Sequence, residues 1–511
     1  MPLRAAQIAI IASSTFASLS FAMTPSTQAA HFIGNRWLAA STGATLPMLD
    51  PSDGEIFAYI ARGDATDVDA AVRAARASYG AGALPGQGPW GRFSAVERGR
   101  FMMKLAEAIL AHADELALLE CRDTGKPMKQ ARSDATACAR YFEYYAGACD
   151  KLHGETLPYQ AGYTVLTLRE PHGVTGHIIP WNYPMQIFGR SVGAALAAGN
   201  ACVVKPAEDA CLSLLKVAEL AAACGLPEGA LNIVTGLGSE AGAALAAHPD
   251  IDHISFTGSP ATGTAVAQAA AANHRPVTLE LGGKSPQVVF ADANFDEALP
   301  VLVNAIIQNA GQTCSAGSRV LIERPAYALV VERLAEAFGH LTAGAGQADR
   351  DLGPIITAKQ QARVRSFIDA ARRNGLKPAG QGNIAADAPA GGFYVAPVLF
   401  ADVPQQHPLV RDEVFGPVLV ASAFRDEAEA VELANGTPYG LVAGVWTRDG
   451  ARQMRMARHL AAGQVFINNY GAGGGVELPF GGMKHSGYGR EKGFEALLGF
   501  TCLKTIALRH G

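Results

Sequence analysis

The chain is predicted to adopt an α/β fold with two units, the first of them a parallel sheet covered by helices on both faces. Short apolar runs alternate with helical segments, which is typical of parallel strands joined by crossover helices. The length of 511 residues is more than one hydrophobic core usually supports, so two or three domains are expected. A composition of 49% hydrophobic and 17% charged residues is ordinary for a soluble globular enzyme.

The first helices precede the strands of the first sheet. Residues 67–79 are predicted to form a helix with an acidic first turn. Residues 96–122 are predicted to form one long helix that ends at Gly125 and Pro127. Its apolar residues fall near one helical face: Phe101, Leu105, Ile109, Leu116 and Leu119.

The alternation of strands and helices is clearest in the middle of the chain. Residues 201–204, 233–234 and 254–256 are short apolar runs that indicate buried strands, and helices are expected over 212–224 and 241–247. This order predicts a parallel sheet in the first unit.

A second alternating region begins further along the chain. Strands are expected at residues 287–290 and 319–322, a helix follows at 326–338, and 465–467 is a late strand. The pattern supports a second α/β unit, and it does not by itself fix the boundary between the two.

The charge and the cysteines exclude several classes of protein. The net charge is −4, and no cluster of Lys and Arg could bind nucleic acid. The eight cysteines form no C-x-x-C pair and have no metal-ligand spacing with His, so neither a metal site nor a disulfide framework is expected. Cysteines in a chain of this length fit a reducing compartment.

Cys314 is the candidate nucleophile. It lies among small residues in Gly311-Gln312-Thr313-Cys314-Ser315-Ala316-Gly317, which leave the sulfur approachable. Glu280, in Leu279-Glu280-Leu281-Gly282-Gly283-Lys284, is a carboxyl group in an apolar setting and a candidate general base. The alternative is that a free cysteine is a small buried hydrophobe. That alternative is favoured for the other seven: Cys121, Cys138, Cys149, Cys202, Cys211, Cys224 and Cys502.

These two segments, together with Pro180-Trp181-Asn182-Tyr183-Pro184, resemble signature motifs of the aldehyde dehydrogenase superfamily, and the resemblance extends over residues 31–508. It implies a Rossmann-type cofactor domain, an α/β catalytic domain, a small β oligomerisation arm, and a homodimer or homotetramer. The expected limits are 23–148 and 171–282 for the NAD-binding domain, 283–483 for the catalytic domain, and 149–170 and 484–511 for the arm.

A turn suited to phosphate follows the strand at 254–256. Thr257-Gly258-Ser259 leads into a helical segment that contains Gly263, and such a turn directs backbone N–H groups towards an anion. The G-x-x-x-x-G spacing is weak evidence alone. The resemblance implies that this is the dinucleotide turn and that Ser259 contacts the pyrophosphate.

The resemblance assigns Lys205 and Glu208 to the adenosine ribose of the cofactor. A carboxylate there accepts hydrogen bonds from a free 2′-hydroxyl and repels a 2′-phosphate, so Glu208 favours NAD over NADP. Alternatively, Glu208 only complements a helix dipole. The resemblance also adds four residues to the cofactor site: Trp181, Gly282, Glu413 and Phe415.

The implied chemistry is covalent oxidation of an aldehyde to a carboxylic acid. The Cys314 thiolate attacks the carbonyl, and the amide of Asn182 with the backbone N–H of Cys314 would stabilise the alkoxide. Loss of hydride gives a thioester, which water activated by Glu280 hydrolyses. Relatives that acylate coenzyme A generally lack this glutamate, so the hydrolytic branch is expected. Glu491 matches a glutamate that carries the proton away; the alternative is a structural ion pair.

The substrate is less well defined. Arg190 takes a position that faces the substrate tunnel in relatives, where a guanidinium suits a carboxylate or a polar aromatic ring; the alternative is a structural ion pair. A semialdehyde or aromatic aldehyde is therefore expected. Tyr183, Phe188 and Phe480 could form aromatic walls. The glycine-rich loop 471–477 could leave a roomy pocket, and Glu477 could recognise a cationic tail, as in aminoaldehyde or betaine aldehyde oxidation.

Two readings from other classes remain open: a non-catalytic, crystallin-like protein on the same fold, and a thioesterase-like hydrolase that uses Cys314 and Glu280 without a cofactor. Intact catalytic residues argue against the first, and NAD dependence would exclude the second. No histidine adjoins Cys314 as it does in the phosphorylating glyceraldehyde-phosphate dehydrogenases.

The first 22 residues resemble a secretory signal, with Arg4, an uncharged stretch, and Ser20-Phe21-Ala22 at a cleavage site. The stretch contains too many polar residues for a good membrane span. The alternative is that translation begins at Met23. Because a nicotinamide enzyme needs a cytosolic cofactor pool, a cytoplasmic location is expected, with secretion left open.

Overall fold

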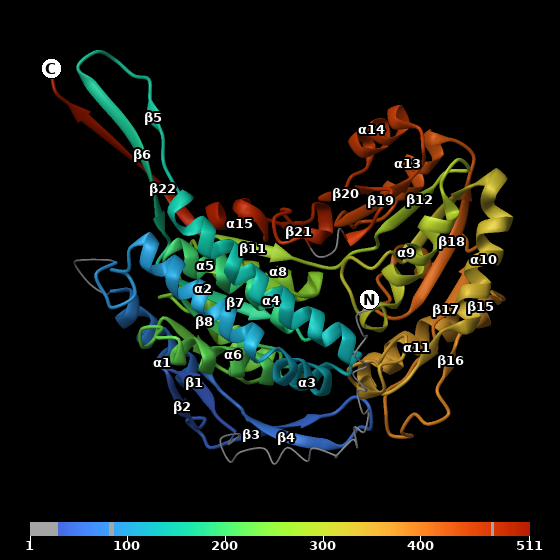
Figure 1. The fold of residues 1–511 in the computed structure, drawn as a ribbon, viewed down its shortest axis with the longest axis horizontal. Coiled ribbons are helices and arrows are strands. Elements are labelled where there is room, and N and C mark those ends of the chain that lie inside the picture. The colour runs from blue at the N-terminus through green and yellow to red at the C-terminus, as the bar shows by residue number, and fades with distance from the viewer. Residues whose placement is uncertain (1–28, 81–85, 472–474) are drawn as a thin grey trace, which may run out of the picture.

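The computed structural model describes residues 29–80, 86–471 and 475–511. The signal-like segment 1–22 lies outside the described residues. Figure 1 shows two α/β units side by side and a narrow β arm that projects from the first unit and carries the C-terminus. No helix among the described residues is both long and apolar enough to cross a bilayer.

The first unit contains an eight-stranded sheet. Its spatial order is β2 (Arg36–Leu38), β1 (His31–Ile33), β9 (Leu231–Ile233), β8 (Ala201–Pro206), β7 (Val174–Ile179), β10 (His253–Thr257), β11 (Val277–Glu280) and β21 (Gly487–Tyr488). The five strands from β9 to β11 are parallel, and the outer strands are antiparallel to their neighbours. Every residue of β8 is buried, as expected for a parallel strand covered on both faces. The predicted parallel sheet is confirmed.

Helices cover both faces of this sheet. One layer contains α5 (Pro184–Ala198) and α6 (Leu212–Ala223), and α4 (Met128–Ala148) packs outside α5. The opposite layer contains α1 (Ala65–Tyr79), α7 (Ala243–Ala247), preceded by the π-turn Gly238–Gly242, and α8 (Pro260–Ala272). A capping box between Asp64 and Asp67 begins α1, which explains the acidic first turn read from the sequence.

The long helix predicted over 96–122 is wrong in one respect: it is two helices, α2 (Ala95–Ala111) and α3 (Ala113–Thr124). His112, between them, has φ −110° and ψ 18°, and its Nδ1 hydrogen-bonds the carbonyl of Ala108 at 2.8 Å. The break turns α3 onto α6, so burial of its apolar face overrides the continuous helical pattern. Gly125 ends α3 in the left-handed conformation.

The second unit contains a seven-stranded sheet. Its order is β15 (Pro378–Gln381), β17 (Val398–Ala401), β18 (Val418–Phe424), β13 (Arg319–Glu323), β12 (Pro286–Val289), β19 (Val442–Trp446) and β20 (Gln464–Ile467). Only β15 is antiparallel to its neighbour. One face packs against α9 (Phe295–Ile307) and α10 (Tyr327–His340), and the other against α13 (Glu427–Asn435) and α14 (Gly450–His459). Each face has its own apolar core.

The arm is a three-stranded antiparallel sheet of β22 (Thr501–Arg509), β6 (Tyr163–Pro171) and β5 (Thr156–Leu157), visible in Figure 1 away from both units. Within residues 484–511, only β22 belongs to this sheet; β21 pairs with β11, and α15 (Gly493–Gly499) packs on α5. The remaining elements are peripheral: β3 (Thr45–Leu49), β4 (Ile56–Ala61), β14 (Thr342–Ala343), β16 (Asn383–Ile384), α11 (Ala358–Arg373) and α12 (Pro408–Arg411).

Candidate active site

A cavity of about 580 Å³ contains the candidate nucleophile, and its size suits a small organic substrate. Residues from α4, from the start of α5, from the loop before Cys314, and from the chain after β19 form its walls. Five of the residues predicted from the sequence line it: Asn182, Tyr183, Arg190, Cys314 and Phe480.

Cys314 lies on this cavity and is half-buried. Its loop is held by Asn309, whose backbone N–H donates to Gln130 Oε1 at 3.0 Å and whose side-chain amide donates to the carbonyl of Asn182 at 2.8 Å. Burial raises the pKa of the Cys314 thiol to about 11, and the nearby Arg190 guanidinium opposes that shift. At neutral pH the thiol is therefore protonated and needs a base before it can attack.

Gly282 and Gly283, which follow Glu280, allow the segment that carries Glu280 to pack directly against the loop that carries Cys314. A Cβ atom at Gly283 would be 2.3 Å from the carbonyl oxygen of Cys314, and one at Gly282 would be 2.4 Å from Oε2 of Glu413. Neither position accommodates a side chain without moving backbone or the Glu413 carboxylate. The Gly-Gly pair therefore sets the spacing between the end of β11 and Cys314.

Glu280 ends β11 with its side chain fully enclosed; the residue is 1% exposed. Within the described chain, neither of its carboxyl oxygens has a hydrogen-bond partner. Burial raises the pKa of Glu280 well above its usual value, and the Glu491 carboxylate adds to the rise. A desolvated carboxyl of this kind is a stronger base, once ionised, than one in water.

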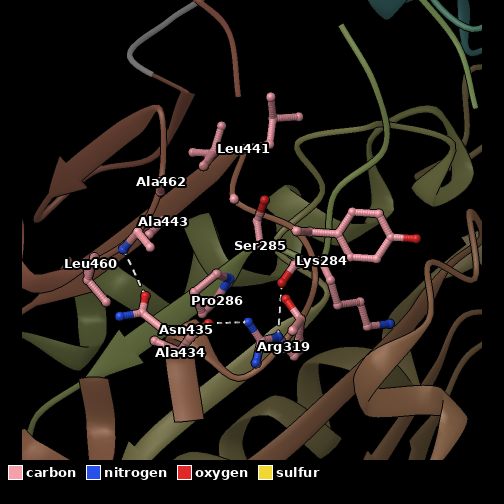
Figure 2. A pocket seen from close by; sticks show the side chains of 15 residues that line it. Lys284, Ser285, Pro286, Arg319, Ala434, Asn435, Leu441, Ala443, Leu460 and Ala462 are labelled. Atoms are coloured by element: carbon pink, nitrogen blue, oxygen red, sulfur yellow. Dashed lines mark hydrogen bonds between the residues drawn. The ribbon is translucent and has the colours of Figure 1, made fainter. Parts of the chain in front are cut away.

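Arg319 holds the segment that follows Gly283 in place through hydrogen bonds to the backbone. Figure 2 shows the Arg319 guanidinium turned towards the backbone of Lys284 and Ala434, and it donates to their carbonyls at 2.9 and 2.7 Å. The small cavity drawn there contains none of the predicted catalytic residues. Arg319 therefore acts on the site indirectly, because it fixes the position of the Gly-Gly-Lys turn.

Asn182 sits just before α5 and is 5% exposed. Its side-chain amide donates one hydrogen bond to the carbonyl of Gln312 at 3.0 Å. Because a primary amide has two N–H groups, the second can serve an oxyanion on the Cys314 side of the loop. The bond to Gln312 fixes the orientation of the amide beside the nucleophile.

Arg190 and Glu491 form a buried ion pair between the guanidinium Nε and carboxylate Oε2. The other carboxylate oxygen accepts a hydrogen bond from Ser255 at 2.8 Å, and Arg190 also donates to Thr257 at 3.3 Å. Both oxygens of Glu491 are thus engaged. Of the two alternatives read from the sequence, this arrangement favours the structural ion pair for both residues.

Tyr183 and Phe480 form aromatic walls of the cavity. The Tyr183 hydroxyl is within hydrogen-bond distance of Thr313 Oγ1 at 2.8 Å and accepts from the Gln130 amide at 3.1 Å. The Arg190 guanidinium lies 5.0 Å from the centroid of the Phe480 ring. These contacts hold both rings in place around Cys314.

Two of the predicted substrate residues do not reach the cavity. Phe188 is fully buried in the core and packs against Phe142 at 6.1 Å, because α5 is enclosed all round and residue 188 faces α4. Glu477 does not line the cavity and forms a surface ion pair with Arg140 of α4 at 2.6 Å, so its charge is matched outside the site. Residues 472–474 of the predicted roomy loop lie outside the described residues.

The predicted adenosine end of the cofactor site has suitable donors and acceptors. Lys205 is the next-to-last residue of β8 and donates to Glu208 Oε2 at 2.9 Å. This ammonium and carboxylate can donate to and accept from a ribose diol. Ser259 caps α8 and is exposed, accepting from the N–H of Thr262 at 3.2 Å. The start of α8 suits a pyrophosphate because its backbone N–H groups point outwards.

The predicted nicotinamide end lies close to the nucleophile's loop. Glu413 accepts a hydrogen bond from the N–H of Gly283 at 2.9 Å, and burial raises the pKa of its carboxyl to about 7. Trp181 and Phe415 meet edge to face with ring centroids 5.4 Å apart. The helix that carries Gly263 packs closely on the residue that follows β11: a Cβ at Gly263 would lie 2.6 Å from Leu281.

Several residues on the cavity were missed from the sequence, among them Gln186, Phe466, Tyr470 and Lys492. Lys492 directly follows Glu491, and its position next to a predicted site residue is the one signal that could have drawn attention to it. Tyr470 donates to the carbonyl of Ser315 at 2.5 Å from beyond the end of β20. The described residues contain no cluster of His, Cys, Asp or Glu able to hold a metal ion.

The sequence model of the aldehyde dehydrogenase family matches residues 37–506. The crystal structure of a candidate aldehyde dehydrogenase from Burkholderia cenocepacia is 70% identical, with a TM-score of 0.93 over 94% of this chain and 100% of that one. An NAD⁺ complex of an aldehyde dehydrogenase from Bacillus cereus is 39% identical, with a TM-score of 0.91 over 96% of this chain and 99% of that one. A mitochondrial benzaldehyde dehydrogenase from Antirrhinum majus is 41% identical over 93% of this chain and 88% of its own length.

Proposed function

The chain belongs to the aldehyde dehydrogenase family, and from that premise we propose that it oxidises an aldehyde to its carboxylic acid with NAD, by the hydrolytic route. One observation carries the proposal. The Cys314 thiol opens onto the cavity, and Gly283 brings the segment of the enclosed Glu280 carboxyl onto the backbone of Cys314.

The chain's own groups account for the proton movements. Ionised Glu280 takes the proton of the Cys314 thiol, because that thiol has a pKa raised to about 11 and does not ionise unaided. The sulfur then bonds to the aldehyde carbon, and Asn182 together with the Cys314 N–H donates to the resulting alkoxide. After hydride loss, Cys314 carries a thioester. Glu280 gives up the thiol proton to solvent and, ionised again, deprotonates water. The water adds to the thioester, and the acid and the Cys314 thiolate are released.

The residues at the predicted cofactor site fit NAD. Lys205 and Glu208 offer the donors and acceptors of a ribose site, and Glu208 disfavours a 2′-phosphate. When bound, NAD supplies the acceptor for the hydride that leaves the aldehyde carbon. The relative from Bacillus cereus that forms an NAD⁺ complex supports this choice.

The substrate is proposed to be an aromatic aldehyde or a semialdehyde. Tyr183, Phe466, Tyr470 and Phe480 give the cavity aromatic walls, which suit a flat ring. The relative that is named a benzaldehyde dehydrogenase supports the aromatic option. The aminoaldehyde alternative loses its proposed anchor, because Glu477 pairs with Arg140 at the surface.

The test is NADH formation by purified protein with benzaldehyde, succinate semialdehyde, a short aliphatic aldehyde and an aminoaldehyde, each with NAD or NADP. Cys314→Ala is expected to lower turnover at least about a thousandfold while NAD still binds. The matched control is Cys211→Ala, a fully buried cysteine outside the cavity. NADH formation that survives in Cys314→Ala would overturn the covalent route. Ester hydrolysis that does not depend on NAD, without NADH formation from any aldehyde, would favour the thioesterase reading.

A further inference from the structure

The loop that carries the nucleophile begins with a run of left-handed residues. Asn309, Ala310 and Gly311 have φ values of 46°, 53° and 76°. Glycine adopts this conformation readily, but Asn309 and Ala310 carry a Cβ atom, which makes it costly. Such a backbone persists where the surrounding structure imposes it. The contacts of the peptide unit that opens the run, between residues 308 and 309, therefore affect where Cys314 lies.

Both polar groups of this peptide unit belong to one ring of hydrogen bonds. The N–H of Asn309 donates to Gln130 Oε1 at 3.0 Å, and the Gln130 amide donates to the Tyr183 hydroxyl at 3.1 Å. That hydroxyl lies 2.8 Å from Thr313 Oγ1, which donates to the carbonyl of Gln308 at 3.4 Å, the longest bond of the ring. The ring thus starts at the N–H of the peptide unit and ends at its carbonyl.

The chemistry of the groups sets the direction of each bond in the ring. A carbonyl only accepts, so Gln308 takes the one hydroxyl proton of Thr313, and Tyr183 donates to Thr313. A backbone N–H only donates, so Asn309 takes the amide oxygen of Gln130 and leaves the NH2 group for Tyr183. Hydrogen bonds that all run in one direction polarise and strengthen one another. The hydroxyl protons of Tyr183 and Thr313 are therefore used within the ring.

The ring connects the two α/β units beside the catalytic cavity. Gln130 lies in the first turn of α4 and Tyr183 directly before α5, both in the first unit, and both line the cavity. Residues 308–313 lead to Cys314 in the second unit. The Asn182 amide, which is proposed to stabilise the alkoxide, belongs to the first unit. Attack therefore requires that the sulfur from one unit is held in register with the amide from the other.

We propose that Gln130 is a positioning residue for Cys314. Through the ring it holds the left-handed run 309–311, and so it keeps the sulfur in place relative to the Asn182 amide. The inference rests on the proposed function and deepens it, because it names a residue that takes no part in the chemical steps and on which their geometry depends. Gln130 bonds to Asn309 and Tyr183, so its effect reaches the sulfur through the loop.

Gln130→Met tests the proposal, because it keeps the length of the side chain and removes both of its hydrogen bonds. We expect kcat to fall at least about tenfold for benzaldehyde and for a short aliphatic aldehyde alike, with the Kd of NAD unchanged. Hydrogen exchange at the amides of residues 309–314, measured by mass spectrometry without substrate, is expected to become at least about tenfold faster. This second readout reports the order of the loop and does not depend on turnover.

Tyr183→Phe opens the same ring at the hydroxyl and leaves the aromatic wall in place. If the ring acts as one unit, the losses in kcat from Gln130→Met and Tyr183→Phe are not additive. The double variant is then expected to be slower than Gln130→Met by less than about threefold, although each single variant is slower than the wild type. Losses that simply multiply would show that the two side chains act separately, and this would overturn the role of the ring.

Gln453→Met is the matched control. Gln453 is a half-buried glutamine of α14 in the second unit, and its amide donates to the carbonyl of Thr447 at 2.9 Å. It is expected to change kcat less than about twofold and to leave exchange at residues 309–314 unchanged.

Unchanged exchange or unchanged kcat in Gln130→Met would overturn the inference. So would a loss confined to KM for aldehydes with polar ring substituents, because Gln130 would then be a substrate contact. Absence of NADH formation by the wild type would count against the proposed function, while the exchange rates would still decide whether Gln130 holds the loop.

Discussion

The guanidinium of Arg190 and the carboxylate of Glu491 form an ion pair beneath the catalytic cavity, with side chains only 7% and 1% exposed. The pair joins α5 to the segment that follows Phe480, and Ser255 of β10 completes it. A charge neutralised in this way is poorly suited to binding a second carboxylate. It can instead hold the wall of the site and set the field at Cys314 and Glu280.

Removal of one partner of this pair is therefore expected to destabilise the protein and to slow all substrates alike. Arg190→Met should lower the free energy of unfolding by about 3–5 kcal/mol, because it leaves the Glu491 charge buried without its partner. The double variant Arg190→Met with Glu491→Gln should recover part of that loss. Urea unfolding of the single and double variants measures both effects.

The matched control is the exposed pair of Arg36 and Glu228, whose side chains are 72% and 66% exposed. Arg36→Met is expected to change the free energy of unfolding by less than about 1 kcal/mol. If Arg190→Met instead impaired acidic or aromatic aldehydes far more than hexanal, Arg190 would have a recognition role after all.

Glu280→Gln removes the base from both halves of the proposed reaction. It is expected to slow steady-state turnover at least about a hundredfold, since neither the Cys314 thiol nor the water that cleaves the thioester has its base. The pKa of Glu280 is raised and the base is its ionised form, so the wild-type rate should increase with pH through that raised pKa. This rise should be absent from Glu280→Gln. The pH profile of kcat tests the assignment, and an unchanged profile in the variant would contradict it.

The same pKa shift has a consequence for stability. The unfolded carboxyl has the ordinary pKa of 4.5, and burial raises it in the folded chain. Between the two values the folded state binds more protons, so the free energy of unfolding falls as the pH rises through this window. Glu280→Gln is expected to make that fall smaller, which urea unfolding at pH 5 to pH 8 would detect.

Gly283→Ala is expected to damage the site although it adds one methyl group. Its Cβ would lie 2.3 Å from the carbonyl oxygen of Cys314, so the nucleophile's loop must move. A displacement near 1 Å at the reacting sulfur costs roughly a hundredfold in kcat/KM. The control is Gly147→Ala in α4, where nothing lies within 4 Å of the new Cβ. That change should stabilise the protein by about 0.5–1 kcal/mol and leave kcat/KM unchanged, and equal losses in both variants would refute the argument.

The sequence predicted the parts of the fold whose patterns are local. Strands such as 201–204 and 254–256 are short apolar runs, and their alternation with helices allows little besides parallel sheets. The break at His112 was missed because it arises from the packing of α3 on α6, and the apolar pattern continues through it. The local apolar periodicity gives no information about that contact.

In the candidate site, too, the residues in local motifs were predicted and those placed by tertiary contacts were not. Cys314, Glu280 and Asn182 could be predicted because each stands in a motif whose residues indicate its chemical role. Phe188 and Glu477 were assigned to the pocket from their positions in the sequence alone. The orientation of those two depends on which side of α5 faces α4, and on the distant Arg140. Lys492 was missed because its direction depends on a backbone conformation that residue type does not predict.

The choice of cofactor is expected to depend on Glu208. Its carboxylate accepts a hydrogen bond from the Lys205 ammonium at 2.9 Å, near the end of β8. Burial acts to raise the pKa of Glu208, but the Lys205 ammonium outweighs burial and holds that pKa below its usual range. Glu208 is therefore ionised at neutral pH, and it repels a 2′-phosphate. Glu208→Ser should reduce the ratio of kcat/KM for NAD over NADP at least about tenfold. The control Glu228→Ser, at an exposed ion pair, should leave that ratio unchanged. A wild type that prefers NADP, or a ratio unaffected by Glu208→Ser, would show that another group selects the cofactor.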